Sequence, residues 1–123
     1  MISYAIIDNI FHVSLSGTIE LKDLLTFLKD FSEIENRPED LKIFYDLTQA
    51  NVDLHLDDIN KLSAIAEKST LDLSSVKTAF LVEDPKVTAY AMLFSWLPTN
   101  ERINRKQFST KDAAIEWLNS NED

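Results

Sequence analysis

The most informative stretch of the chain reads Lys42-Ile43-Phe44-Tyr45-Asp46-Leu47-Thr48. It is rich in β-branched and aromatic residues, and it ends in a carboxylate and a hydroxyl. In an extended conformation both faces of residues 43–47 are apolar, which is typical of a central strand covered by helices on each side. Ligands of open α/β sheets bind at the carboxyl ends of such strands. Asp46 and Thr48 are therefore candidate binding residues, and we expect the chain to turn after Thr48.

Helix patterns lie on either side of this strand. Residues 20–34 repeat leucines and a phenylalanine at helical spacing, and the pattern ends before Pro38 because the residue preceding a proline avoids the α conformation. Asp53 is a suitable N-cap for a second helix that runs to about Lys68, and it is also a candidate binding residue. The first turn of that helix holds Asp57 and Asp58, and its buried face is expected to hold Leu56, Ile59, Leu62 and Ile65.

A second apolar run, residues 78–82, predicts another internal strand. In this strand Phe80 and Val82 should be as fully buried as Phe44 and Leu47 in the first. Asp84-Pro85 follows, in the order expected of an N-cap and a proline at the first helical position.

The two ends of the chain complete the order of elements. Residues 2–7 and 10–16 read as a hairpin joined at Asp8-Asn9, and Gly17 should end its second strand. Residues 103–108 read as a polar edge strand, and a capping box is expected over Ser109-Thr110-Lys111-Asp112. One face of the last helix carries Ala113, Ala114, Trp117 and Leu118.

The resulting order is ββαβαβαβα. It argues for an α/β fold in which residues 1–123 form one domain with a largely parallel, mixed sheet and right-handed crossovers. The N-terminal hairpin supplies the antiparallel element.

Charge and composition disfavour several classes of protein. Acidic residues outnumber basic ones by 21 to 12, for a net charge of −9, so neither nucleic acid nor an anionic membrane surface is an expected partner. The chain has no cysteine, and its single glycine excludes the usual dinucleotide and P-loop motifs. No apolar run approaches the roughly 20 residues of a membrane span, and no signal peptide is evident. We therefore expect a soluble, cytoplasmic protein without a cofactor or a membrane span.

Several of these patterns together carry a resemblance to a known family. They are the strand–Gly17 step into a helix, Phe44-Tyr45-Asp46-Leu47-Thr48 followed by a short loop and Asp53, Ala79-Phe80-Leu81-Val82 before Asp84-Pro85, and Phe108 leading to Ala114-Ile115-Glu116-Trp117-Leu118. The combination resembles the STAS fold, and more closely the SpoIIAA-like proteins, which are grouped with STAS and CRAL-TRIO (Sec14-type) lipid-binding domains. The likeness spans almost the whole chain and lies in hydrophobic patterning rather than in a chemical signature.

The resemblance implies a phosphorylation switch, but the residues after Asp53 do not fit it. In the family a serine, usually followed by glycine, lies just after an aspartate at the start of the second helix and acts as a phosphorylation switch. Here the matching aspartate is Asp53, and Leu54-His55-Leu56 follows, without a hydroxyl or a glycine. The resemblance therefore implies a binding or scaffold module, and its lipid-binding relatives suggest an apolar ligand as the alternative.

Acidic residues are the one concentration of reactive groups in the sequence. Two of these carboxylates could hold Mg²⁺ with waters, but roles as helix caps and first-turn acids explain them better, so no metal site is predicted. Asp46-Leu47-Thr48 is similar to the opening of an aspartyl-phosphate loop, but the second acid is missing at position 48. His55 lies at a helix N-terminus, where the dipole opposes protonation, so we expect no catalysis. The acids concerned are Asp46, Asp53, Asp57, Asp58, Glu83 and Asp84.

The helix over residues 86–97 is apolar nearly all round. At about 100° per residue, one stripe (Val87, Tyr90, Phe94 and Leu97) should dock onto the sheet. The second stripe, largely on the opposite side, consists of Ala89, Met92, Leu93 and Trp96. We predict that it forms the interface of a homodimer with Met92 and Trp96 near its centre, because tryptophan and methionine are favoured there.

Other occupants of the second stripe remain open. They are a protein partner, an apolar small molecule, or simply the loop 98–102 or the N-terminal hairpin folding over Trp96. An apolar cavity of roughly 300 Å³ or more would favour a carrier of small apolar or lipid-like molecules. A solid core with an exposed apolar patch would favour a non-catalytic module that works through protein partners or self-association, which is the reading we prefer.

Overall fold

Five strands form one sheet in chain order, β1-β2-β3-β4-β5, with β1 antiparallel to β2 and every other neighbouring pair parallel. The computed structural model describes residues 1–98 and 100–121. Its elements follow the predicted order and are β1 (Ile2–Ile7), β2 (Ile10–Ile19), α1 (Leu21–Ser32), β3 (Asp40–Val52), α2 (Leu56–Lys68), β4 (Ser75–Leu81), α3 (Pro85–Trp96), β5 (Ile103–Phe108) and α4 (Lys111–Asn119).

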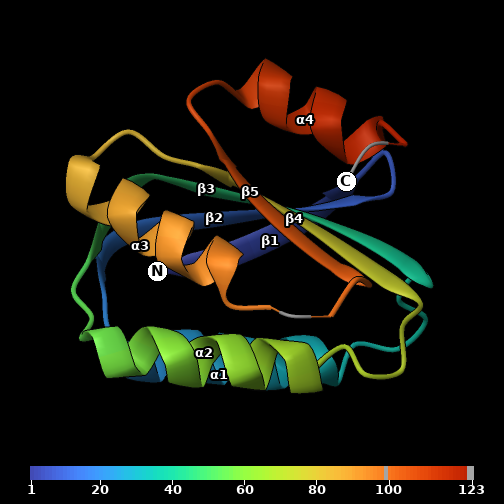
Figure 1. The fold of residues 1–123 in the computed structure, drawn as a ribbon, viewed down its shortest axis with the longest axis horizontal. Coiled ribbons are helices and arrows are strands. Elements are labelled where there is room, and N and C mark those ends of the chain that lie inside the picture. The colour runs from blue at the N-terminus through green and yellow to red at the C-terminus, as the bar shows by residue number, and fades with distance from the viewer. Residues whose placement is uncertain (99, 122–123) are drawn as a thin grey trace.

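The helices cover the sheet unequally. Figure 1 shows α4 on one side of the sheet and α1 and α2 side by side on the other, with α3 along the front. Register-paired residues of parallel strands share a face, so Phe11, Ile43 and Thr78 lie on the side of α1–α3. Phe44 and Ala79 lie on the opposite side and pack with residues of α4. The sheet with helices on both faces is the arrangement that the apolar run at 43–47 predicted.

The N-terminal hairpin turns at Asp8 and Asn9, whose φ angles of +51° and +66° are those that a tight two-residue turn needs. The prediction that Gly17 ends the second strand is wrong. Gly17 has a φ of +74°, and β2 continues through it to Ile19. Between Ser14 and Ser16 the paired residues of β3 advance from Asp46 to Gln49, so β3 carries one extra residue there, a β-bulge beyond which the two strands pair again.

The predicted turn after Thr48 is wrong for the same reason. Strand β3 runs on to Val52, because Ser16–Ile19 of β2 pairs with Gln49–Val52. Asp53 consequently does not cap α2. The N-cap is His55, whose backbone N donates to Asp58 Oδ2 at 3.0 Å.

Helix ends and faces show further differences from the sequence predictions. Helix α1 is shorter than residues 20–34 at both ends. The side chain of Leu56, expected in the core, is 67% exposed, because it lies in the first turn of α2. At α4 the expected capping box is absent, since Thr110 is the N-cap and its side chain accepts from Ala113 N at 3.3 Å. Ala113 itself is exposed.

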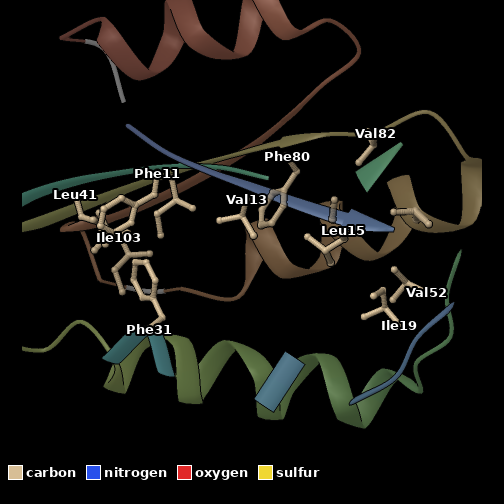
Figure 2. Packing of buried hydrophobic residues seen from close by; sticks show 14 of the residues in the cluster. Phe11, Val13, Leu15, Ile19, Phe31, Leu41, Val52, Phe80, Val82 and Ile103 are labelled. Atoms are coloured by element: carbon tan, nitrogen blue, oxygen red, sulfur yellow. The ribbon is translucent and has the colours of Figure 1, made fainter. Parts of the chain in front are cut away.

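Two groups of buried side chains form the core. Figure 2 shows Phe11, Val13 and Leu15 of β2 in the larger group, in the layer between the sheet and the helices, together with Phe31 and Phe80. The smaller group joins Phe44 to α4. The predicted burial of Phe44, Phe80 and Val82 is confirmed. Leu47 is only half-buried; it lies one residue past the pairing of β3 with β4, which ends at Asp46.

Candidate functional site

The predicted binding residues do not form one site. Asp46 and Thr48 are joined, because Asp46 Oδ1 accepts from Thr48 N at 3.0 Å and from Thr48 Oγ1 at 2.6 Å. Asp53 lies elsewhere, with its side chain exposed and its carboxylate 3.3 Å from Lys86 Nζ. The hydrogen bond to Asp53 raises the pKa of Lys86. The carboxylate of Asp46 is thus occupied by Thr48, two residues along β3, and that of Asp53 by Lys86 in the first turn of α3.

Asp46 lines a hollow on the α4 side of the sheet, of about 300 Å³. His12 lies there against the Phe44 ring, with centroids 5.5 Å apart. Burial, and to a lesser extent Lys111, lower the pKa of His12, while Asp8 opposes the shift. In the part of the chain described, no hydrogen bond joins His12 to Ser14 or Asp46, so no nucleophile and base are paired. The lining is too polar for the apolar cavity of a carrier; it consists of Ser3, Tyr4, Ala5, Ile7, His12, Ser14, Phe44, Asp46 and Lys111.

Among residues 1–98 and 100–121, no group of three or more histidines, aspartates and glutamates is placed to hold an ion. The cap predicted at Asp84 is confirmed: its Oδ2 accepts from Lys86 N at 3.0 Å and from Val87 N at 3.1 Å.

Helix α3 has one docked face and one open face. Val87 is buried, and Tyr90 and Phe94 pack against the core as the first stripe predicted. Ala91, which belongs to neither stripe, is buried as well.

On the second stripe the first and last residues are exposed, and the two between them are half-buried. Met92 and Leu93 are half-buried, Ala89 is exposed, and the Trp96 side chain is 69% exposed. The N-terminal hairpin and the described part of the loop 98–102 leave Trp96 open; residue 99 of that loop lies outside the described residues.

An apolar cavity lies between the sheet and helices α1, α2 and α3. Its volume is about 130 Å³, and aliphatic and aromatic side chains from all three helices and from β2 to β5 line it. The lining includes three large polar side chains, Tyr45 of β3, Tyr90 of α3 and Arg105 of β5. The Tyr90 hydroxyl is already bonded, since it donates to Leu54 O at 2.9 Å, which leaves Tyr45 and Arg105. The Tyr45 ring stacks on Phe80, with centroids 5.4 Å apart and planes 16° apart.

Arg105 is the charged member of this cavity. Its Nη1 donates to Ser63 Oγ of α2 at 2.7 Å and to the Phe94 carbonyl of α3 at 3.0 Å. The guanidinium carbon lies 4.0 Å from the centroid of the Phe94 ring. Burial lowers the pKa of Arg105 to about 10, and burial raises the pKa of Tyr45 to about 12. At neutral pH Arg105 is therefore a cation and Tyr45 a neutral phenol.

Sequence reasoning missed both of these residues. Tyr45 was taken only as part of an apolar run, and residues 103–108 only as a polar edge strand. The signal was the alternation Ile103-Asn104-Arg105, which puts Arg105 on the same face as a large aliphatic residue and hence on the covered face of the sheet.

A comparison with solved structures finds a protein of similar architecture. The chain is similar to the crystal structure of an uncharacterized protein from the DUF3478 family with a SpoIIAA-like fold, from Shewanella loihica PV-4. The TM-score is 0.59 over 96% of this chain and 92% of that one, at 16% sequence identity. The chain has a SpoIIAA-like fold. At this identity the likeness concerns the fold, and the relation to CRAL-TRIO domains stays a prediction.

Two other comparisons find no relative: no family model and no curated protein matches the chain. Leu54 and His55 lie between β3 and α2, and Leu56 is the first residue of α2. None of the helices in the described ranges is long and apolar enough to cross a membrane.

Proposed function

We propose that this protein is a non-catalytic binding module of SpoIIAA-like fold that works by association with protein, in the first place with a second copy of itself. The observation that carries the proposal is the open face of α3. A tryptophan that is 69% exposed lies there beside Met92 and Leu93. Exposed apolar patches of this kind mark interaction sites, and tryptophan is enriched at the centres of protein interfaces.

Charge supports a second copy as the occupant. The chain carries a net charge of −9, which opposes contact between most parts of two copies. The segment from Val87 to Leu97, however, contains no charged residue, so two α3 helices can approach without bringing like charges together.

The two rival functions have less support. A phosphorylation switch of the family type lacks its acceptor, since Leu54, His55 and Leu56 have no hydroxyl. A carrier of lipid-sized molecules needs a cavity of roughly 300 Å³ or more, whereas the apolar cavity holds about 130 Å³.

Tryptophan fluorescence over a dilution series tests the proposal. Trp117 is 7% exposed and reports a constant environment, whereas Trp96 becomes buried in the proposed dimer. We expect the emission maximum to move to longer wavelength as the protein is diluted from high micromolar to nanomolar concentration. Emission that stays constant across this range contradicts the proposal.

A further inference from the structure

Arg105 has hydrogen-bonding capacity that the protein does not use. Its Nη1 makes both of the hydrogen bonds described above, and neither Nε nor Nη2 bonds to any residue among 1–98 and 100–121. In those ranges the ion pairs involve Lys22, Arg37 and Lys86, so no carboxylate lies within 4.0 Å of the Arg105 guanidinium. The charge of Glu67 acts on Arg105 from beyond this distance and offsets only part of the effect of burial on its pKa. A cation withdrawn from water without a carboxylate in contact is costly, which makes this arginine in an apolar cavity an indication of an anionic ligand.

Tyr45 offers a second donor in the same cavity. Its hydroxyl has no hydrogen bond to a described residue, although the ring is fixed by stacking on Phe80. In the described part of the chain, the one unpaired side-chain nitrogen or oxygen that is completely sealed is Trp117 Nε1. The Tyr45 hydroxyl and the two remaining nitrogens of Arg105 are therefore not completely sealed from solvent.

A structural role accounts for only one of the three guanidinium nitrogens of Arg105. The bonds from Nη1 to Ser63 and Phe94 tie α2 to α3, and this role requires a single nitrogen. It leaves unused the remaining edge of the guanidinium, where two parallel N–H groups match the two oxygens of a carboxylate.

We propose that this cavity binds a small monocarboxylic acid as its anion, with the carboxylate on Arg105, the Tyr45 hydroxyl as a further donor, and the apolar body among the lining side chains. One guanidinium balances one negative charge, so a monoanion fits better than a phosphate dianion. A cavity of about 150 Å³ holds a benzene ring, and the 130 Å³ here thus admits a short acyl chain or a single small ring. The proposal goes beyond self-association and does not depend on it.

Calorimetric titration of the full chain with hexanoate and with hexan-1-ol tests this inference. The two probes share an apolar body and differ in charge. We expect hexanoate to bind more tightly than hexanol, and Arg105→Gln to weaken hexanoate at least about tenfold, as expected for a charged hydrogen bond, while hexanol binding changes little. Lys42→Gln is the matched control, since it also removes one positive charge and Lys42 bonds to Asn119 Oδ1 of α4, on the other side of the sheet from the cavity.

Tyr45→Phe keeps the ring and removes only the hydroxyl, so it is informative even if Arg105→Gln does not fold. We expect this variant to lose hexanoate affinity and to keep its affinity for hexanol. Equal binding of the two probes to the wild type, absence of hexanoate binding, or unchanged hexanoate affinity in both cavity variants overturns the proposal. None of these outcomes bears on the oligomeric state, which is measured separately.

Discussion

At the scale of single residues, two phenylalanines of neighbouring strands hold the layers of the fold together. Phe44 faces α4 and is 3% exposed, whereas Phe80 faces the opposite layer and is 7% exposed. Phe80 contacts Tyr45 by stacking and Phe94 edge-on, with centroids 5.8 Å apart in the second case. Each ring thus joins the sheet to a different set of helices.

We therefore predict that Phe44→Ala and Phe80→Ala each lower the free energy of unfolding by about 3–5 kcal/mol. The loss comes from the apolar contacts and from the cavity left behind, and urea denaturation measures it. Leu56→Ala serves as the control, since a side chain that is 67% exposed loses little on truncation. An unchanged denaturation midpoint in Phe80→Ala contradicts the position of β4 inside the sheet.

The environment of His12 gives a pH-dependent prediction. Its pKa is lowered from 6.5, chiefly by burial and then by Lys111. The native state therefore binds fewer protons than the unfolded chain, and the stability that neutral His12 contributes is present above pH 6.5 and lost as the pH falls through the lowered pKa.

Titration by NMR should show the His12 ring protonating below its ordinary pH, and Lys111→Gln should raise this pKa. Lys106→Gln, an exposed lysine on β5, is the control and should leave it unchanged. If Lys111→Gln has no effect, the electrostatic contribution assigned to Lys111 is wrong.

Single-residue roles were only partly predictable from the sequence. Asp84 was identifiable because an N-cap is a local pattern, in which the donors lie two and three residues along the chain. Arg105 was not, because its role depends on Ser63 and Phe94, which come from two other elements. A polar residue in an edge strand gives no sign of such partners.

At the scale of elements, one irregularity explains two incorrect boundaries. The extra residue of β3 between Asp46 and Gln49 shifts the register, after which pairing resumes and β2 continues through Gly17, at positive φ, to Ile19. Its extension pairs with the extension of β3 to Val52, so the two errors share a cause. Sequence patterns indicate the local propensity of residues for strand or turn, but hydrogen-bonded pairing with a strand distant in sequence can override that propensity.

The elements whose ends are set by local chemistry were predicted more closely. Helix α3 begins at Pro85, after the Asp84 cap, as the sequence indicated. We predict that Asp84→Ala destabilises the protein by about 1 kcal/mol, because two backbone N–H groups lose their acceptor. Chemical denaturation measures the effect, and Glu83→Ala, an exposed neighbour outside the cap, is the control. Equal stability of the two variants argues against the cap.

At the scale of the whole molecule, the exposed apolar surface of α3 lies in a segment without charged residues, although the chain as a whole is strongly acidic. The molecule carries a net charge of −9, yet the open face of α3 presents an uncharged surface around Trp96. The order of elements and the sheet were predictable, since apolar strands alternate with amphipathic helices. The internal cavity was not, because it depends on how side chains from three helices and four strands meet.

Light scattering after size-exclusion chromatography tests the central claim of self-association through α3 most directly. The wild type should have about twice the 14.1 kDa mass of one chain, and Trp96→Asp should have the mass of one. Leu71→Asp is the matched control, because Leu71 and Trp96 are both 69% exposed and Leu71 lies outside α3; it should remain a dimer. A wild type that is monomeric at micromolar concentration, or a Trp96→Asp variant that stays dimeric, contradicts the account.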